Sequence, residues 1–235
     1  MSNTTKQDQQ NNIQGNNQST KSPKPRKRQG KWVISAQVSP HYSIQVQQNL
    51  AQKLARQGDW TGAIDLLTQL IHLEPQNPIH YNNRGLLHFQ NGNHAKALKD
   101  YNYALELNPN LDNTYNNRAN YYAARHEYWL AIADYETSIE INPLNARAWI
   151  NLGITYRDMG LYQLAQENFD TALLFRQLEG NIYAERGRTH HLEGDWNWAI
   201  ADYQKALTYL SIEGDHQACC QVRTWMQQLL SPEAT

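Results

Sequence analysis

Five alanines lie 34 residues apart, and this spacing constrains the fold more than any other feature of the chain. They are Ala63, Ala97, Ala131, Ala165 and Ala199. A second ladder of small residues keeps the same step at Ala51, Gly85, Ala119, Gly153 and Gly187. An aromatic ladder follows it at Tyr101, Tyr135, Phe169 and Tyr203. A fixed period of this length is typical of stacked repeats, in which each unit buries its apolar face only against its neighbours. The sequence therefore predicts a binding surface presented by a repeat array, and no catalytic pocket.

The repeats follow one another without insertion, as 44–77, 78–111, 112–145, 146–179 and 180–213. Within each unit, apolar and small residues recur at helical spacing in two groups. Four glycines lie between the two groups, where a helix ends and the chain reverses: Gly58, Gly92, Gly160 and Gly194. Asn108-Pro109 and Asn142-Pro143 end the second helix of their units. Each repeat is predicted to be a helical hairpin.

The segments outside the repeats differ from them in composition. Residues 1–29 are polar and basic, and we expect this tail to be disordered because it has too little apolar surface to bury. Residues 30–43 are more apolar and are predicted to be a linker or a segment that packs on the first helices. Residues 214–231 are predicted to form a capping helix over the last hairpin. Its apolar stripe consists of Ala218, Val222, Trp225, Met226 and Leu229.

The fourth unit carries a recognisable pattern of large and small residues. Its members are Trp149, Leu152, Gly153, Tyr156, Gly160, Ala165, Phe169 and Ala172. This pattern, repeated over 44–213, resembles the tetratricopeptide repeat (TPR). The resemblance implies an all-α, right-handed superhelical solenoid of antiparallel helix pairs that binds proteins. The chain departs from the pattern at His126, where a turn glycine is usual, and at Gln177 and Ser211, where proline is usual. The two missing prolines predict looser junctions after the fourth and fifth repeats.

A polar ladder follows the same period at Asn49, Asn83, Asn117 and Asn151, here called the asparagine row, and ends at Glu185. The resemblance places these positions on the concave groove of the solenoid. Side-chain amides both donate and accept hydrogen bonds, so a row of them can hold an extended peptide backbone without reading its sequence. A similar asparagine ladder occurs in the superhelix attached to O-linked N-acetylglucosamine transferase. The alternative is that asparagine is simply common at this position of the repeat.

Further residues are predicted to line the groove beside the asparagine row. The polar ones are Gln45, Gln48, Gln52, Asn82, Asn113, Asn116, Asn120, Arg147, Arg157, Asn181 and Arg188, and the apolar ones are Leu86, Phe89, Ile150 and Ile154. A clamp for the C-terminal tail of a chaperone is not favoured. Arg147 with Asn151 matches such a clamp only in part, because the other positions that would supply its Lys–Asn pair hold amides or apolar residues.

Arginine and aspartate occur together in three of the five repeats. Arg84, Arg118 and Arg186 occupy the seventh position of their units, and the same units carry Asp100, Asp134 and Asp202 at the twenty-third. The other two repeats pair Leu50 with Leu66 and Leu152 with Asn168. We expect structural ion pairs between the two helices of a hairpin, since one partner alone would be a costly buried charge.

Signals of catalysis are missing from the sequence. The glycines end hairpins and follow no strand, so none belongs to a phosphate-binding loop. None of the nine histidines has HExxH spacing, and we expect no metal, no cofactor and no small-molecule substrate. Cys219 and Cys220 are adjacent, which disfavours a disulfide between them. The chain is predicted not to be an enzyme.

The charge is distributed unevenly between the tail and the repeats. Residues 1–31 carry seven Lys or Arg and one Asp, which is +6, while residues 32–235 carry −7. Contacts through Lys24, Arg26, Lys27 and Arg28 of the stretch 21–31 with nucleic acid, an anionic membrane or an acidic surface stay open. The chain has no long apolar run and no apolar segment near its start that would serve as a signal peptide, so we expect a cytoplasmic protein whose oligomeric state is open.

Three functions are compatible with these features. The first is a non-enzymatic scaffold or adaptor that holds an extended partner segment in the groove. An assembly factor for a multiprotein complex is the second, because soluble TPR proteins resembling this chain serve the assembly of photosystems and other complexes. The third is a nucleic-acid-associated regulator that uses the basic tail.

Overall fold

The computed structural model describes residues 40–230, which form eleven α-helices. The helices are α1 Pro40–Arg56, α2 Trp60–Leu73, α3 Pro78–Gln90, α4 His94–Leu107, α5 Asp112–Ala124, α6 Tyr128–Ile141, α7 Ala146–Asp158, α8 Tyr162–Leu173, α9 Glu179–Glu193, α10 Trp196–Glu213 and α11 His216–Leu230. The predicted all-α class is confirmed. The predictions for residues 1–39, including the tail contacts of Lys24, Arg26, Lys27 and Arg28, lie outside the described residues. α1 begins at Pro40, four residues before the first predicted repeat.

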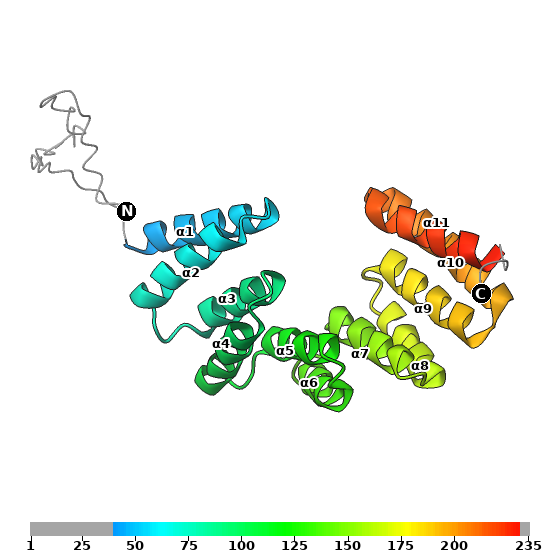
Figure 1. Ribbon diagram of the computed structural model, residues 1–235, viewed down its shortest axis with the longest axis horizontal. Helices are drawn as coiled ribbons and strands as arrows, with labels where there is room; N and C mark the ends of the chain where they lie inside the picture. The colour runs from blue at the N-terminus through cyan, green and yellow to red at the C-terminus, as the bar shows by residue number, and fades with distance from the viewer. Residues whose placement is uncertain (1–39, 231–235) are drawn as a thin grey trace, which may run out of the picture. The chain divides into compact units, whose positions relative to one another are not determined.

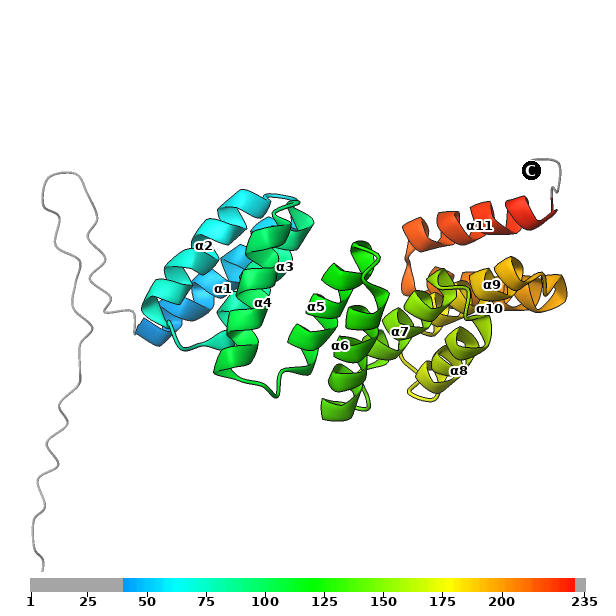
Figure 2. The ribbon, with the colours of Figure 1, turned by 60° about the horizontal axis from the view of Figure 1, so that its bottom comes forward.

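Consecutive helices pack as hairpins, α1 with α2 and so on to α9 with α10, and each hairpin packs against the next. The helices of one hairpin run antiparallel, as α5 and α6 show in Figure 2. The first helices α3, α5, α7 and α9 also contact one another in succession (Figure 1). We call the surface shared by α1, α3, α5, α7 and α9 the odd-helix face. The predicted solenoid of antiparallel helix pairs is confirmed.

The two ladders of small and aromatic residues pack against each other inside each hairpin. A Cβ atom added to Gly85 would lie 2.8 Å from the ring of Tyr101, and one added to Gly153 would lie 2.8 Å from the ring of Phe169. Both rings are fully buried. Glycine therefore lets the aromatic ring of the second helix pack closely against the backbone of the first, which explains why both ladders share one period.

Left-handed backbone conformation occurs in the tight turns between the two helices of every repeat. Gly58, Gly92, Gly160 and Gly194 have φ values between 75° and 95°. His126 takes the same place in the third repeat with φ of 60°. A residue with a Cβ atom is strained in this region, and His126 Nδ1 lies 2.7 Å from the hydroxyl of Tyr128 in the same turn. The departure seen in the sequence is therefore a point of backbone strain.

In three of the hairpins, one arginine joins the hairpin to the one before it. The structure brings together the pairs Arg84–Asp100, Arg118–Asp134 and Arg186–Asp202, each through two N–H···O bonds of 2.7 or 2.8 Å. The remaining Nη1 group of each arginine donates to the second helix of the preceding repeat, at Thr68, Asn102 and Asp170 respectively. Each arginine therefore links three helices, and its aspartate partner is buried.

The two junctions without proline differ from each other. After α8 the chain makes an irregular connection in which Arg176 and Leu178, on either side of Gln177, have φ of 50° and 56°. After the fifth repeat, α10 continues as a helix through Ser211 and ends at Glu213. At this second junction the missing proline thus lengthens the helix, because a residue with a backbone N–H continues the hydrogen-bond ladder.

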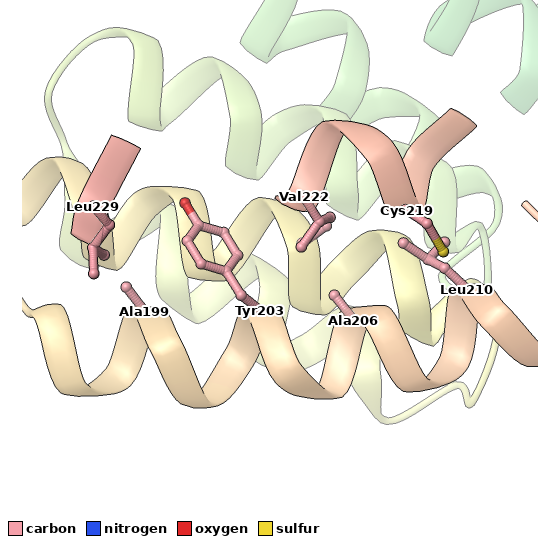
Figure 3. Close-up of a cluster of buried hydrophobic side chains, with 8 residues drawn as sticks. Ala199, Tyr203, Ala206, Leu210, Cys219, Val222 and Leu229 are labelled. Carbon is pink, nitrogen blue, oxygen red and sulfur yellow. The ribbon is translucent and has the colours of Figure 1, made fainter. Parts of the chain in front are cut away.

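The last helix, α11, covers the end of the fifth hairpin. Cys219, Val222 and Leu229 of α11 pack on Ala199, Tyr203, Ala206 and Leu210 of α10 (Figure 3). Ala218, Trp225 and Met226 border this cluster. Cys219 is buried and Cys220 is exposed, and both are free thiols. Burial of the apolar stripe of α11 shields the α10 surface that a further repeat would otherwise cover.

Candidate protein-binding surface

The asparagine row lies on the odd-helix face, with Asn49 on α1, Asn83 on α3, Asn117 on α5 and Asn151 on α7. Asn49 is exposed, and the other three are partly buried. The period of 34 residues places one amide on each successive first helix. The row therefore crosses four hairpins, which is the arrangement needed to contact an extended chain laid across them.

Part of the hydrogen-bonding capacity of the row is used between repeats. Asn117 Nδ2 donates to Asn82 Oδ1 at 3.0 Å, and Asn82 Nδ2 donates to Asn83 Oδ1 at 3.1 Å. Asn151 Nδ2 donates to Asn116 Oδ1 at 3.0 Å. Asn82 and Asn116 are buried, so their amides act as internal acceptors. Among residues 40–230, the Oδ1 atoms of Asn117 and Asn151 accept no hydrogen bond, and these acceptors are held in fixed orientations by the bonds that their own Nδ2 groups make.

Asn120 and Phe89, which were also predicted to line the groove, have partners of their own. Asn120 Oδ1 accepts a bond of 2.6 Å from the hydroxyl of Tyr135. The ring of Phe89 packs edge-on against His94 and Tyr121, with centroids 5.5 and 6.3 Å away. Asn120 and Phe89 therefore stabilise the odd-helix face through contacts within the protein. The Oδ1 atom of Asn120 already accepts a hydrogen bond from Tyr135.

The three predicted arginines do not form a group of free cations. Arg157 Nη1 donates to Glu185, the residue that ends the polar ladder, and Nη2 contacts Asp158. Burial opposes the charged form of Arg157, but Glu185 and Asp158 together outweigh burial and raise the pKa of the guanidinium above its ordinary value. Arg188 lies over the ring of Trp225 at 5.7 Å, which ties α9 to α11. Arg147, in contrast, is exposed at the start of α7.

A hollow of about 280 Å³ opens between α1 and α3 at the first end of the asparagine row. Its apolar lining consists of Ala51, Ala55, Leu67, Ile79, Leu86 and Leu87. Gln48, Gln52 and Asn83 supply polar groups beside it. Such a combination of apolar floor and amide rim suits a peptide side chain whose backbone is hydrogen-bonded at the edge.

Sequence reasoning named Gln48, Gln52, Asn83 and Leu86 individually but did not predict this hollow. The available signal was Ile79, because the corresponding second position of the other repeats holds Gln45, Asn113, Arg147 and Asn181. An aliphatic side chain at the one place where its counterparts are polar marks the apolar end of the face. Ile79 is 45% exposed, so it is available to a partner.

Comparison with known proteins identifies the family of the repeats. Two family models, both described as tetratricopeptide repeat, match residues 49–112 and 144–211. The chain belongs to the tetratricopeptide repeat family, whose fold is a scaffold for protein–protein interaction. A search of curated protein sequences finds no match.

Solved structures with the same fold share little sequence with this chain. TTC0263, a thermophilic TPR protein of Thermus thermophilus, has a TM-score of 0.67 at 18% identity, covering 80% of this chain and 98% of its own. PilF of Pseudomonas aeruginosa has a TM-score of 0.65 at 14% identity, covering 83% and 94%. MamA has a TM-score of 0.57 at 19% identity, covering 75% and 96%. At these identities the likeness shows the fold.

None of the helices in residues 40–230 has both the length and the apolar character needed to cross a membrane.

Proposed function

We propose that the odd-helix face holds an extended segment of a partner protein. In this proposal an apolar side chain of the partner enters the hollow between α1 and α3, and the partner backbone runs along the asparagine row. The observation that carries the proposal is the position of Asn83, which lines the hollow and also belongs to the row. Anchor and backbone contacts would thus follow one another along one face.

The hydrogen-bond geometry supports recognition of the backbone in preference to particular polar side chains. The Oδ1 atoms of Asn117 and Asn151 face no internal donor among the described residues, and each can accept one backbone N–H. Each net hydrogen bond contributes about 1 kcal/mol, so the amides alone give weak binding and the apolar anchor must supply the rest. This division predicts tolerance for many sequences with a strict requirement for one apolar residue.

Substitutions in the hollow test the proposal without removing the bonds between repeats. Full-length chain carrying Ile79→Glu and Leu86→Glu should lose the partners that the unchanged chain captures from native lysate, because a charge would be buried against the partner's apolar side chain. Leu161→Glu is the matched control, since Leu161 is an exposed leucine in the turn between α7 and α8, outside the hollow. Identical partner lists for the double variant and the unchanged chain would contradict the proposal.

An adaptor that assembles a larger complex would use the same face, and the captured partners would distinguish it from a scaffold for a single protein. Contact of residues 21–31 with nucleic acid or an anionic membrane stays a prediction about residues outside the described part of the chain.

A further inference from the structure

Three metal-ligating side chains converge at the turn between α9 and α10. His190 and Glu193 lie on the last turn of α9, and Asp195 follows Gly194 just before α10 begins. One nitrogen or oxygen from each residue lies within 4.8 Å of those of the other two. His190 Nδ1 is 3.9 Å from Asp195 Oδ2. The residues that would line the peptide groove include none of these three.

The side-chain amide of Gln166, on α8, contacts two members of this cluster through a single nitrogen atom. Its Nε2 group donates to Glu193 Oε2 and lies 3.3 Å from His190 Nδ1. His190 Nδ1 therefore acts as an acceptor, which puts the ring proton on Nε2, the nitrogen that lies 3.9 Å from the buried carboxylate of Asp202. The lone pair of His190 Nδ1 and the carboxylate of Glu193 thus both face the Nε2 group of Gln166. A cation at this place would be bound by the same two groups. Rotation of the Gln166 amide would present Oε1 there as a fourth ligand.

Asp195 provides an independent indication, because it does not cap its own helix. Two other turns have the same Gly-Asp sequence, and there Asp59 Oδ1 and Asp215 Oδ1 each accept a backbone N–H of the following helix at 2.9 Å. Asp195 makes no side-chain capping bond to α10. The Oδ2 atom of Asp195 lies 3.9 Å from His190 Nδ1 instead, so this carboxylate is oriented differently from those of Asp59 and Asp215.

We propose that His190, Glu193 and Asp195, with Gln166, bind a divalent transition-metal ion. One imidazole and two carboxylates are ligands that suit Zn²⁺, and the exposure of both carboxylates leaves room for water as a further ligand. The ion would join α8 to the α9–α10 turn and so bridge the irregular junction that contains Arg176 and Leu178. His190, Glu193 and Asp195 lie close together in the sequence but do not have HExxH spacing, and Gln166 comes from the preceding repeat.

Titration of full-length, metal-free chain with ZnCl₂ in a calorimeter tests the proposal. We expect one binding event per chain. The double variant Glu193→Gln and Asp195→Asn should weaken binding at least about 10-fold, since it removes both charged ligands from exposed positions. His72→Gln is the control, because His72 is exposed on α2 and should leave binding unchanged. Gln166→Glu should tighten binding by adding a third carboxylate.

Trp198 offers a second readout at the site. Its ring is stacked on His190 with centroids 6.2 Å apart, so CuCl₂ bound at the cluster should quench Trp198 fluorescence. The portion of the quenching that Trp198→Phe removes should also disappear in the Glu193→Gln, Asp195→Asn variant. Absence of Zn²⁺ binding by the unchanged chain would overturn the proposal, and so would equal affinity in the double variant, which would place the ion elsewhere.

Discussion

Asn117 Nδ2 donates a hydrogen bond of 3.0 Å to Asn82 Oδ1, although the two residues are 35 positions apart and belong to different hairpins. The next repeat copies the bond, from Asn151 to Asn116 at the same distance. Asn117 and Asn151 therefore have two functions each. Their Nδ2 groups hold neighbouring hairpins together, while their Oδ1 atoms remain available on the odd-helix face.

We predict that Asn151→Ala destabilises the chain by about 1 to 2 kcal/mol, because it leaves the buried Oδ1 atom of Asn116 without its donor. Urea unfolding followed by circular dichroism measures the change. Asn49→Ala is the matched control, since Asn49 is exposed and donates to no neighbouring hairpin among residues 40–230. Equal stability of the two variants would show that the bond between repeats contributes nothing.

The ion pair of Arg118 and Asp134 leads to a prediction of non-additivity. Asp134→Leu should destabilise the protein by about 3 kcal/mol, because it leaves a largely buried guanidinium whose remaining hydrogen-bond partner is the neutral Asn102. Replacing both residues by leucine should destabilise it much less, since the first repeat already pairs Leu50 with Leu66 at these positions. A double-mutant cycle in urea measures the coupling, and additive effects would contradict the prediction.

The period of 34 residues was sufficient to predict the hairpins, because ladders such as Gly85 with Tyr101 record backbone contacts that every repeat shares. The partner of each arginine was predictable for the same reason. The third contact of these arginines was not, because Thr68, Asn102 and Asp170 have no residue type in common. The bonds within the asparagine row were also missed, since they depend on side-chain rotamers that spacing does not determine. The hollow at Ile79 depends on one repeat that differs from the others at this position. A search for residues that recur every 34 positions does not detect such a difference.

The turn at His126 predicts a stabilising substitution. His126→Gly should raise the free energy of unfolding by about 0.5 to 1 kcal/mol, because glycine adopts φ of 60° without the strain of a Cβ atom, and this gain exceeds the extra entropy of the unfolded chain. The reverse change, Gly92→Ala, should destabilise the protein by about 1 kcal/mol at φ of 75°. Thermal unfolding of both variants measures the effects, and a lower melting temperature for His126→Gly would show that its contact with Tyr128 outweighs the strain.

Two histidines predict a loss of stability in mild acid. Burial lowers the pKa of His88 and of His191, and Arg188 lowers that of His191 further. Both pKa values lie below the ordinary value of 6.5, so on acidification the unfolded chain takes up these protons before the folded chain does. Stability is therefore complete above that value and decreases as the pH falls from it toward the folded pKa values. Urea unfolding at about pH 7.5 and about pH 5.5 measures the loss, in a range where most carboxylates remain ionised.

Combining His88→Gln with His191→Gln should flatten the profile of stability between these two pH values, whereas His216→Gln, at an exposed position of α11, should leave it unchanged. An unflattened profile in the double variant would assign the acid sensitivity to other groups.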